Sequence, residues 1–230
     1  MKTVLATHVW LDCDIPGYRG EDGGCRRLDR FLHHYQGCWP IRIIDNGSGP
    51  NHWYGISGDV EVTNAQPHYP RAGLLDYPAV WRWYWFIKDL LKEYDKVIAI
   101  ATDAYILSQR LADYIEGLNS GWTALWSPKY NFPATEIQVI TKHCANFQNF
   151  FSGNEDVYKY NGRIEELAVP LTHVEKGFVG DRYGEYDFND IVKLGPKTPF
   201  DGDYYTQVPD NMDDAVFPVL RREDGKLVVK

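Results

Sequence analysis

Polar side chains directly follow three apolar runs of this sequence. They are Thr7 and His8, then Asp45 with Asn46, then Thr102 with Asp103. In an open sheet of parallel strands, ligands are held at the carboxyl ends of the strands, where such residues meet. The sequence therefore predicts a polar ligand site at this edge. Two residues also have structural interpretations: Asp45 suits the turn in "DNGSG", and Asp103 suits a helix N-cap or a loop.

The elements that position these residues follow from hydrophobic periodicity and breaker residues. Strands are predicted at residues 3–11, 40–50 (closed by a turn cluster), 96–102, 123–128 and 136–141. Helices are predicted at residues 23–35, 78–94, 108–118 and 143–153, the third with Ser108 as N-cap and the fourth ended by Gly153. The helix at 78–94 has the clearest pattern, with an apolar face that includes Trp83, Tyr84 and Ile87.

Strands that alternate with helices predict an α/β fold, with a mostly parallel sheet flanked by helices on both faces. The sequence has no internal repeat, and no linker stands before about residue 190, so residues 1–230 are predicted to form a single domain. Residues 190–230 read as an extended tail that ends in a C-terminal β-hairpin, because "EDGK" separates two apolar runs.

Composition and charge narrow the classes of partner. The net charge of −8 repels nucleic acid and anionic membranes, so a polyphosphate ligand needs a local positive group or a metal ion. No run of 18 apolar residues predicts a membrane span, and residues 1–10 show no signal-peptide pattern. The four cysteines lack CxxC spacing, which favours a reduced, cytoplasmic setting. The many aromatics (8 Trp, 16 Tyr, 10 Phe) suit a core better than a stacking surface.

The order "RIIDNGS", a long helix, then "VIAIATDAYILSQRLADYI" resembles the nucleotide-sugar half of GT-A fold glycosyltransferases. The resemblance covers roughly residues 3–180 and implies a GT-A-like, Rossmann-type sheet. In that family an Asp after the second strand contacts the nucleoside, which implies this role for Asp45. A later strand ends in a D-x-D motif that holds a divalent metal on the diphosphate. Here Ala101 replaces the first acid, so only Asp103 carries over as a metal ligand.

A second part of the resemblance lies in "LTHVEKGFVGD". Several GT-A enzymes place a His metal ligand and a diphosphate-binding Lys after the last core strand, which implies these roles for His173 and Lys176. Mn²⁺ or Mg²⁺ held in this way neutralises the charge of a diphosphate leaving group. The resemblance further implies that Thr7, His8 and Thr102 line the donor site. His173 has a second interpretation, as an ordinary loop histidine.

The residues expected at the sugar are carboxylates. Glu136, in "NFPATEIQVI", falls at the family's segment beside the donor sugar and acceptor. It is the candidate base or sugar-binding acid, since an inverting transfer needs a carboxylate to take the proton of the acceptor hydroxyl. Asp181 is the reserve candidate. Arg71, in "HYPRAG", is a candidate for the nucleotide phosphates. Glu136 equally suits an exposed edge strand, and Arg71 equally suits a solvated loop.

The sequence thus predicts a glycosyltransferase that moves a sugar from a nucleoside-diphosphate sugar to a glycan or another hydroxyl acceptor. A nucleotidyltransferase is the first alternative, although "THVWLDCDIPGYRGEDGG" is acidic and lacks the basic, Gly-rich phosphate loop of that class. A non-catalytic sugar- or nucleotide-binding domain of the same fold is the second, and it is favoured by Ala101 in place of the first acid.

Overall fold

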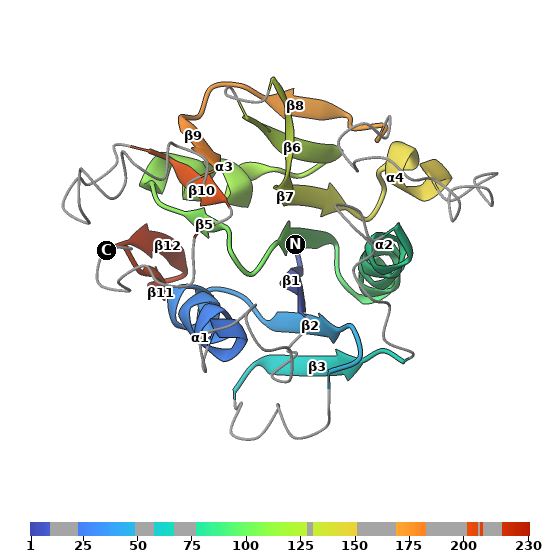
Figure 1. The fold of residues 1–230 in the computed structure, drawn as a ribbon. Helices are drawn as coiled ribbons and strands as arrows, with labels where there is room; N and C mark the ends of the chain where they lie inside the picture. Colours follow the sequence, from blue (N-terminus) through green and yellow to red (C-terminus); the bar gives the residue numbers. More distant parts are fainter. Residues whose placement is uncertain are drawn as a thin grey trace.

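The computed structural model describes residues 1–9, 23–48, 58–66, 77–127, 131–150, 169–182, 202–206, 208 and 218–230. A seven-stranded sheet with the order β3-β2-β1-β4-β7-β6-β8 forms the centre of the molecule (Figure 1). Its strands are β1 (Thr3–Val9), β2 (Ile41–Asp45), β3 (Val60–Asn64), β4 (Lys96–Ile100), β6 (Trp122–Ser127), β7 (Phe132–Thr141) and β8 (His173–Glu175). Only β7 runs antiparallel to its two neighbours, and the other neighbouring pairs are parallel. The prediction of a mostly parallel sheet is confirmed.

Helices cover both faces of this sheet. They are α1 (Gly23–Tyr35), α2 (Tyr77–Glu93), α3 (Gln109–Gly117) and α4 (Ala145–Phe150). Figure 1 shows α1 and α3 on one side of the sheet and α2 and α4 on the other. Every residue of β4 is buried, as is usual for a strand covered on both faces. None of the helices described here is long and apolar enough to cross a membrane.

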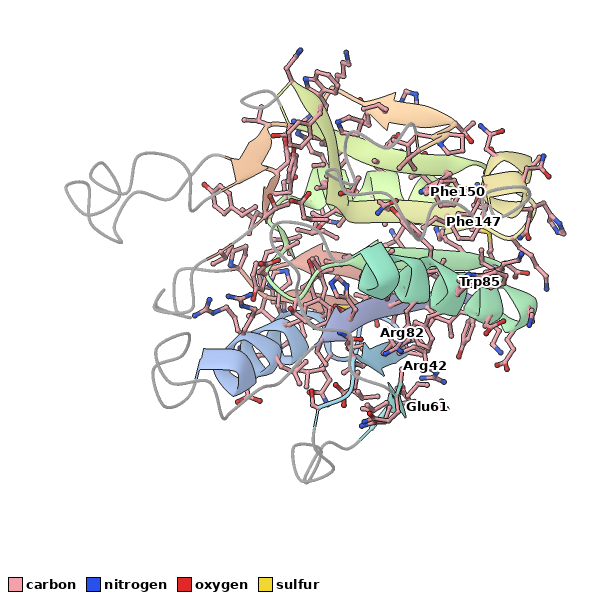
Figure 2. All side chains as sticks on the ribbon, turned by 45° about the vertical axis from the view of Figure 1, so that its right-hand side comes forward. Arg42, Glu61, Arg82, Trp85, Phe147 and Phe150 are labelled. Atoms are coloured by element: carbon pink, nitrogen blue, oxygen red, sulfur yellow. The ribbon has the colours of Figure 1, made fainter. Side chains whose placement is uncertain are left out.

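The two faces of the sheet bury separate apolar clusters. Toward α1 and α3, Leu5 and Ile98 pack with Phe31 and Leu111, among others. Toward α2 and α4, the strands pack against the apolar stripe of α2 and against the end of α4. Phe147 and Phe150 of α4 place their rings edge-on against Tyr84 and Trp122 (Figure 2). The alternation of side chains along each strand sorts the residues between these clusters.

The predicted helices are confirmed in place and type. Ser108 caps α3, since its side chain accepts a hydrogen bond from the backbone N–H of Leu111 at 3.2 Å. At the other end of α3, the ammonium of Lys96 donates to the carbonyl oxygens of Ile115 and Glu116, both at 2.9 Å, and so joins β4 to this helix. The predicted end of the fourth helix, Gly153, lies outside the described residues.

Two smaller sheets complete the fold. The hairpin of β11 (Leu220–Glu223) and β12 (Lys226–Val229) confirms the predicted C-terminal β-hairpin. Its turn uses positive φ at Asp224 (47°) and Gly225 (79°). The second sheet joins β5 (Tyr105–Ile106), β10 (Tyr204–Thr206) and β9 (Gly180–Arg182). Part of the predicted extended tail is therefore a strand, which was not recognised because its three residues are too few to show a period.

The C-terminal hairpin ties α1 to α3. Arg222 donates from Nε to the carbonyl oxygen of Cys38, just after α1, at 2.8 Å. Its Nη2 lies 3.2 Å from a carboxylate oxygen of Glu116 in α3. Arg221 donates to the carbonyl oxygen of His33 in α1 at 2.9 Å. The hairpin thus fixes the two helices that flank the turn after β4, where Asp103 lies.

His34 of α1 is a buried histidine between α1 and β5. Its Nε2 donates to the carbonyl oxygen of Ile106 at 3.0 Å, and its ring packs edge-on against Tyr35 and Tyr105. Burial lowers the pKa of His34 to about 4, since the apolar surroundings disfavour the charged ring, while the hydrogen bond to Ile106 opposes this. His34 therefore stays neutral in the folded protein at pH values at which an unfolded His is protonated.

The stability of the fold is expected to fall by about 2 kcal/mol between pH 7 and pH 5 through His34 alone. The unfolded chain takes up this proton near pH 6.5 and the folded chain only near pH 4, so protons favour the unfolded state between these values. Urea unfolding at both pH values measures the loss. The variant His34→Gln does not titrate and keeps a donor for Ile106. If this variant loses as much stability as the parent protein, His34 is not the cause.

Candidate functional site

The three predicted strand ends lie at one edge of the sheet. β1 is parallel to both β2 and β4, with Val9 beside Asp45 and Ala6 beside Ala99. The carboxyl ends of β1, β2 and β4 therefore point in the same direction, and Thr102 and Asp103 follow directly after β4. This confirms the predicted arrangement of the strands that carry the site.

The two polar residues of β1 face opposite sides of the sheet. Thr7 is completely buried on the α1 side. His8 is exposed, although β1 is a central strand, and its ring lies 5.1 Å from the ring of Trp83 in α2. Exposure at the end of a central strand means that no element covers His8 completely. A ligand at this edge therefore reaches the imidazole of His8 more directly than the hydroxyl of Thr7.

Asp45 organises the turn that follows β2. Its Oδ1 accepts from the backbone N–H of Ser48 at 3.0 Å and from the Ser48 hydroxyl at 2.5 Å. Its Oδ2 accepts from the side-chain amide of Asn64, at the end of β3, at 2.9 Å. The carboxylate is fully buried in this network. Asp45 thus fixes the ends of β2 and β3, and its contact with a nucleoside stays a prediction.

Arg82 of α2 also stabilises the segments that follow β2 and β3. Its guanidinium donates to the side chain of Asn46 at 2.8 Å and to the carbonyl oxygen of Ala65 at 2.9 Å. These bonds join α2 to the segments that follow β2 and β3. Figure 2 shows Arg82 on the part of α2 that faces these segments. The end of β2 is therefore held from the sheet and from the helix together.

Asp103 faces α1. Its Oδ2 lies 3.5 Å from Nη1 of Arg27, and the two side chains are 20% and 36% exposed. The backbone around Asp103 is fixed as well: its carbonyl oxygen accepts from the N–H of Val208 at 3.0 Å. Tyr105, two residues on, donates its hydroxyl to the carbonyl oxygen of Thr102 at 3.3 Å. Asp103 is thus a partly exposed carboxylate at a strand end, paired with a cation.

Glu136 lies next to this strand end. Its backbone carbonyl accepts from the N–H of Ala101 at 2.9 Å, which places β7 beside the segment that leads to Asp103. Continuing the register of β1 and β4 by two residues puts His8 on the other side of Ala101. His8 and Glu136 therefore flank Ala101, two strand spacings or about 10 Å apart at their backbones. Alternation along both strands places the two side chains on the α2 face of the sheet.

The structure does not bring His173 to Asp103. β8 lies three strands from β4, which is about 14 Å at the strand spacing of a sheet. His173 starts β8 beside Thr123, and its Nε2 lies 3.2 Å from the carboxylate of Glu175. Lys176 follows the carboxyl end of β8, at the same edge of the sheet as Asp103, with its ammonium 4.0 Å from the ring centre of Trp126.

The backbone N–H of Gly177 and the imidazole of His173 hold the pKa of Glu175 below its usual range.

Of the last two predicted site residues, Asp181 and Arg71, the structure describes only Asp181. Asp181 lies in β9 and pairs with Tyr205 in β10. Arg71 lies outside the described residues. The carboxylate that the described residues do show in this region is Asp203, which precedes β10 and is 4% exposed. It was not predicted, because "FDGDYYT" reads as a turn.

A protein-held Mn²⁺ or Mg²⁺ fits the described residues poorly. No three His, Cys, Asp or Glu side chains gather as ligands in the part of the chain that the structure describes. Mg²⁺ often uses one or two carboxylates with substrate phosphates, so the ligand count alone does not decide. Charge decides: a cation on Asp103 would lie close to Arg27. Two like unit charges 4 Å apart repel by about 4 kcal/mol at an effective dielectric constant near 20, so the guanidinium of Arg27 offsets much of the attraction that the Asp103 carboxylate has for a cation.

Arg27 is the residue of this site that sequence reasoning missed. The sequence feature that could have indicated Arg27 is its spacing from Arg30, since the two lie one turn apart on a helix that follows a Gly-rich loop. Nothing local showed which strand end this helix face would meet. That information came only from the packing of α1 against the turn after β4.

The solved structures that are similar to this chain include glycosyltransferases. The galactosyltransferase LgtC, in complex with donor and acceptor sugar analogs, has a TM-score of 0.52 and 10% identity over 88% of this chain and 86% of LgtC. The apo form of the glycosyltransferase GlyE from Streptococcus pneumoniae TIGR4 has a TM-score of 0.51 and 12% identity. That match covers 93% of this chain and 61% of the GlyE chain, so this chain spans less than two thirds of its length.

No protein-family profile and no curated protein sequence matches the chain. At such low identity the similarity to LgtC and GlyE concerns the fold alone. The parallel strand ends, the antiparallel strand β7 within the described central sheet and the helices on both faces agree with the resemblance in the sequence. The chain has the GT-A fold of nucleotide-sugar glycosyltransferases.

Proposed function

We propose that this protein transfers a sugar from a nucleoside-diphosphate sugar to a hydroxyl acceptor such as a glycan. The observation that supports this most is the row His8, Ala101 and Glu136, at the carboxyl ends of β1 and β4 and in the amino-terminal half of the antiparallel strand β7, with Asp103 beyond it. An exposed imidazole and a carboxylate lie on either side of the Ala101 backbone on the α2 face, while the Ala101 side chain packs against the cluster on the α1 and α3 side. The shared fold with LgtC and GlyE supports the donor class.

Each residue of this edge has a role in the proposed reaction. Glu136 is the base that takes the proton of the acceptor hydroxyl in an inverting transfer. The acceptor oxygen forms the new bond to the sugar, and the bond from the sugar to the diphosphate breaks, with its electron pair on the diphosphate. His8 and the backbone after β4 line the donor. A positive group must face the diphosphate, because negative charge develops there.

Donor binding is expected to raise the apparent stability of the protein by about 2.7 kcal/mol at a hundredfold excess of ligand over Kd. Thermal shift with UDP-, GDP-, ADP-, CDP- and dTDP-sugars, each in EDTA and in Mn²⁺, identifies the donor and tests the expected metal. Release of the nucleoside diphosphate in the presence of hydroxyl acceptors then measures turnover. Stabilisation without turnover would assign a non-catalytic binding domain, and no stabilisation by any donor would refute the proposal.

A further inference from the structure

The strand end at Asp103 carries its own positive charge, which α1 supplies. Arg27 and Arg30 stand one helical turn apart, so they share the face of α1 that meets the turn after β4. Arg27 lies 3.5 Å from Asp103, and Arg30 is buried and hydrogen-bonds the hydroxyl of Tyr105. Arg27 therefore pairs with the carboxylate of Asp103, and Arg30 adds a second guanidinium that contacts Tyr105, two residues further on. These three groups carry one net positive charge in a protein whose net charge is −8.

Arg27 is the member of this group that a ligand can reach. Its side chain is 36% exposed, whereas Arg30 is 4% exposed. The 3.5 Å separation from Asp103 exceeds the about 2.7–2.9 Å of a tight charge-assisted hydrogen bond. Asp103 therefore orients the guanidinium without holding it in a close bidentate pair. The planar guanidinium presents five N–H donors, a geometry that matches the oxygens of a phosphate.

We propose that Arg27, oriented by Asp103, binds the diphosphate of the sugar nucleotide in place of a protein-held divalent metal. This inference rests on the proposed function. When the bond between the sugar and the diphosphate breaks, the electron pair stays on the phosphate oxygen, and the fixed charge of Arg27 stabilises it. The step needs no further proton or electron. Ala101 agrees with this role, since a second carboxylate at its position would cancel the positive charge of this strand end.

The test is calorimetric titration of the full chain with UDP, GDP, ADP, CDP and dTDP, each in EDTA and in Mn²⁺. One of these diphosphates is expected to bind in EDTA with a Kd close to its value in Mn²⁺. Arg27→Ala is expected to weaken that binding about 10- to 100-fold, the range for hydrogen bonds to charged groups. Affinity for the matching nucleoside is expected to stay unchanged, because only the phosphates meet the guanidinium.

Four further variants separate this role from a structural one. Arg42→Ala is the matched control: Arg42 is also ion-paired, 3.0 Å from Glu61, but it lies near the amino end of β2 (Figure 2). This variant is expected to keep the parent Kd. Arg27→Lys is expected to recover only part of the affinity, because an ammonium lacks the planar fork. Asp103→Ala acts through Arg27, so the double variant is expected to bind no more weakly than Arg27→Ala alone.

The outcomes distinguish this inference from the proposed function. Binding that requires Mn²⁺, with Arg27→Ala at the parent Kd, would overturn the role of Arg27 and leave the glycosyltransferase intact. No binding of any diphosphate in either condition would overturn both. The comparison of EDTA with Mn²⁺ uses the unmodified protein, so it gives an answer even where a variant folds poorly. Arg27→Gln, which keeps most of the side chain and removes the charge, replaces the alanine variant in that case.

Discussion

Glu136→Gln is expected to lower the rate of sugar transfer about 10²- to 10⁴-fold, the usual contribution of a positioned general base. The amide keeps the size of the side chain but does not accept the proton of the acceptor hydroxyl. A group that acts only in the chemical step lowers kcat and leaves donor binding in the ground state unchanged. The Kd of the donor is therefore expected to stay at the parent value.

Two measurements check this prediction together: steady-state release of the nucleoside diphosphate and calorimetric titration with the donor. The matched control is Glu61→Gln, because Glu61 is also a strand glutamate but lies in β3, paired with Arg42 away from the site (Figure 2).

A parent-like kcat in Glu136→Gln would contradict this role. The reserve candidate is Asp181, which β9 places beside Tyr205 of β10. Loss of turnover in Asp181→Asn, with Glu136→Gln active, would move the base from β7 to β9. An equal loss of donor affinity and of kcat in Glu136→Gln would instead make Glu136 a residue that binds the donor sugar.

The long elements of this fold were predictable because their patterns are local. The helix predicted at residues 23–35 is observed as Gly23–Tyr35, and the apolar face predicted for α2 includes Trp83, Tyr84 and Ile87, all of which are buried. The strands β3, β5, β8, β9 and β10 were not predicted. β3 is largely exposed and polar, so its pairing with β2 makes it a strand and its own pattern does not. The others have two or three residues each.

The residues of the candidate site also include some that local patterns predict and some that they do not. The strand ends at His8, Asp45 and Asp103 were predictable, since parallel strands place their carboxyl ends at one edge. The partners of these residues were not, because they come from elements distant in sequence. Arg27 meets Asp103 only because α1 packs beside the turn after β4, and His173 lies far from Asp103 because β8 pairs with β6 at the edge of the sheet. The number of residues between these positions predicts neither the contact of Arg27 with Asp103 nor the separation of His173 from Asp103.

Asp203→Ala is expected to lower the free energy of unfolding by about 1–3 kcal/mol, the range for losing a buried, hydrogen-bonded charged group whose cationic partner is exposed. Asp203 is 4% exposed, and its Oδ1 accepts from the Ser108 hydroxyl at 2.5 Å and from Nε of Arg110 at 2.7 Å. Its Oδ2 accepts from Nη2 of Arg110 and from the backbone N–H of Val179, the latter at 2.6 Å. Alanine leaves the partly buried donors of Ser108 and Val179 without their acceptor, whereas water solvates the exposed guanidinium of Arg110.

The loss of stability in Asp203→Ala is expected to loosen the segment around Asp103 as well. Asp203 also accepts at its carbonyl oxygen from the N–H of Leu107, and Val208 of the same segment donates to the carbonyl oxygen of Asp103. Urea unfolding at pH 7 measures the change in stability. Asp113→Ala is the matched control, because Asp113 is an exposed carboxylate of α3 bonded to Gln109, and a change within about 0.5 kcal/mol is expected there. Equal losses in the two variants would refute the role of Asp203.

The pH dependence of this loss separates the charge of Asp203 from its packing. Burial alone would raise the pKa of Asp203, but the hydrogen bonds from Arg110, Ser108 and Val179 outweigh it and lower the pKa. The carboxylate therefore stabilises the fold above its unfolded pKa of about 3.9, and this contribution is lost as the pH falls through the lowered folded value. The gap in stability between the parent protein and Asp203→Ala is expected to narrow below about pH 4, whereas the loss due to His34 already occurs between about pH 6.5 and 4. A gap that stays constant in acid would show that Asp203 acts through its packing and neutral hydrogen bonds.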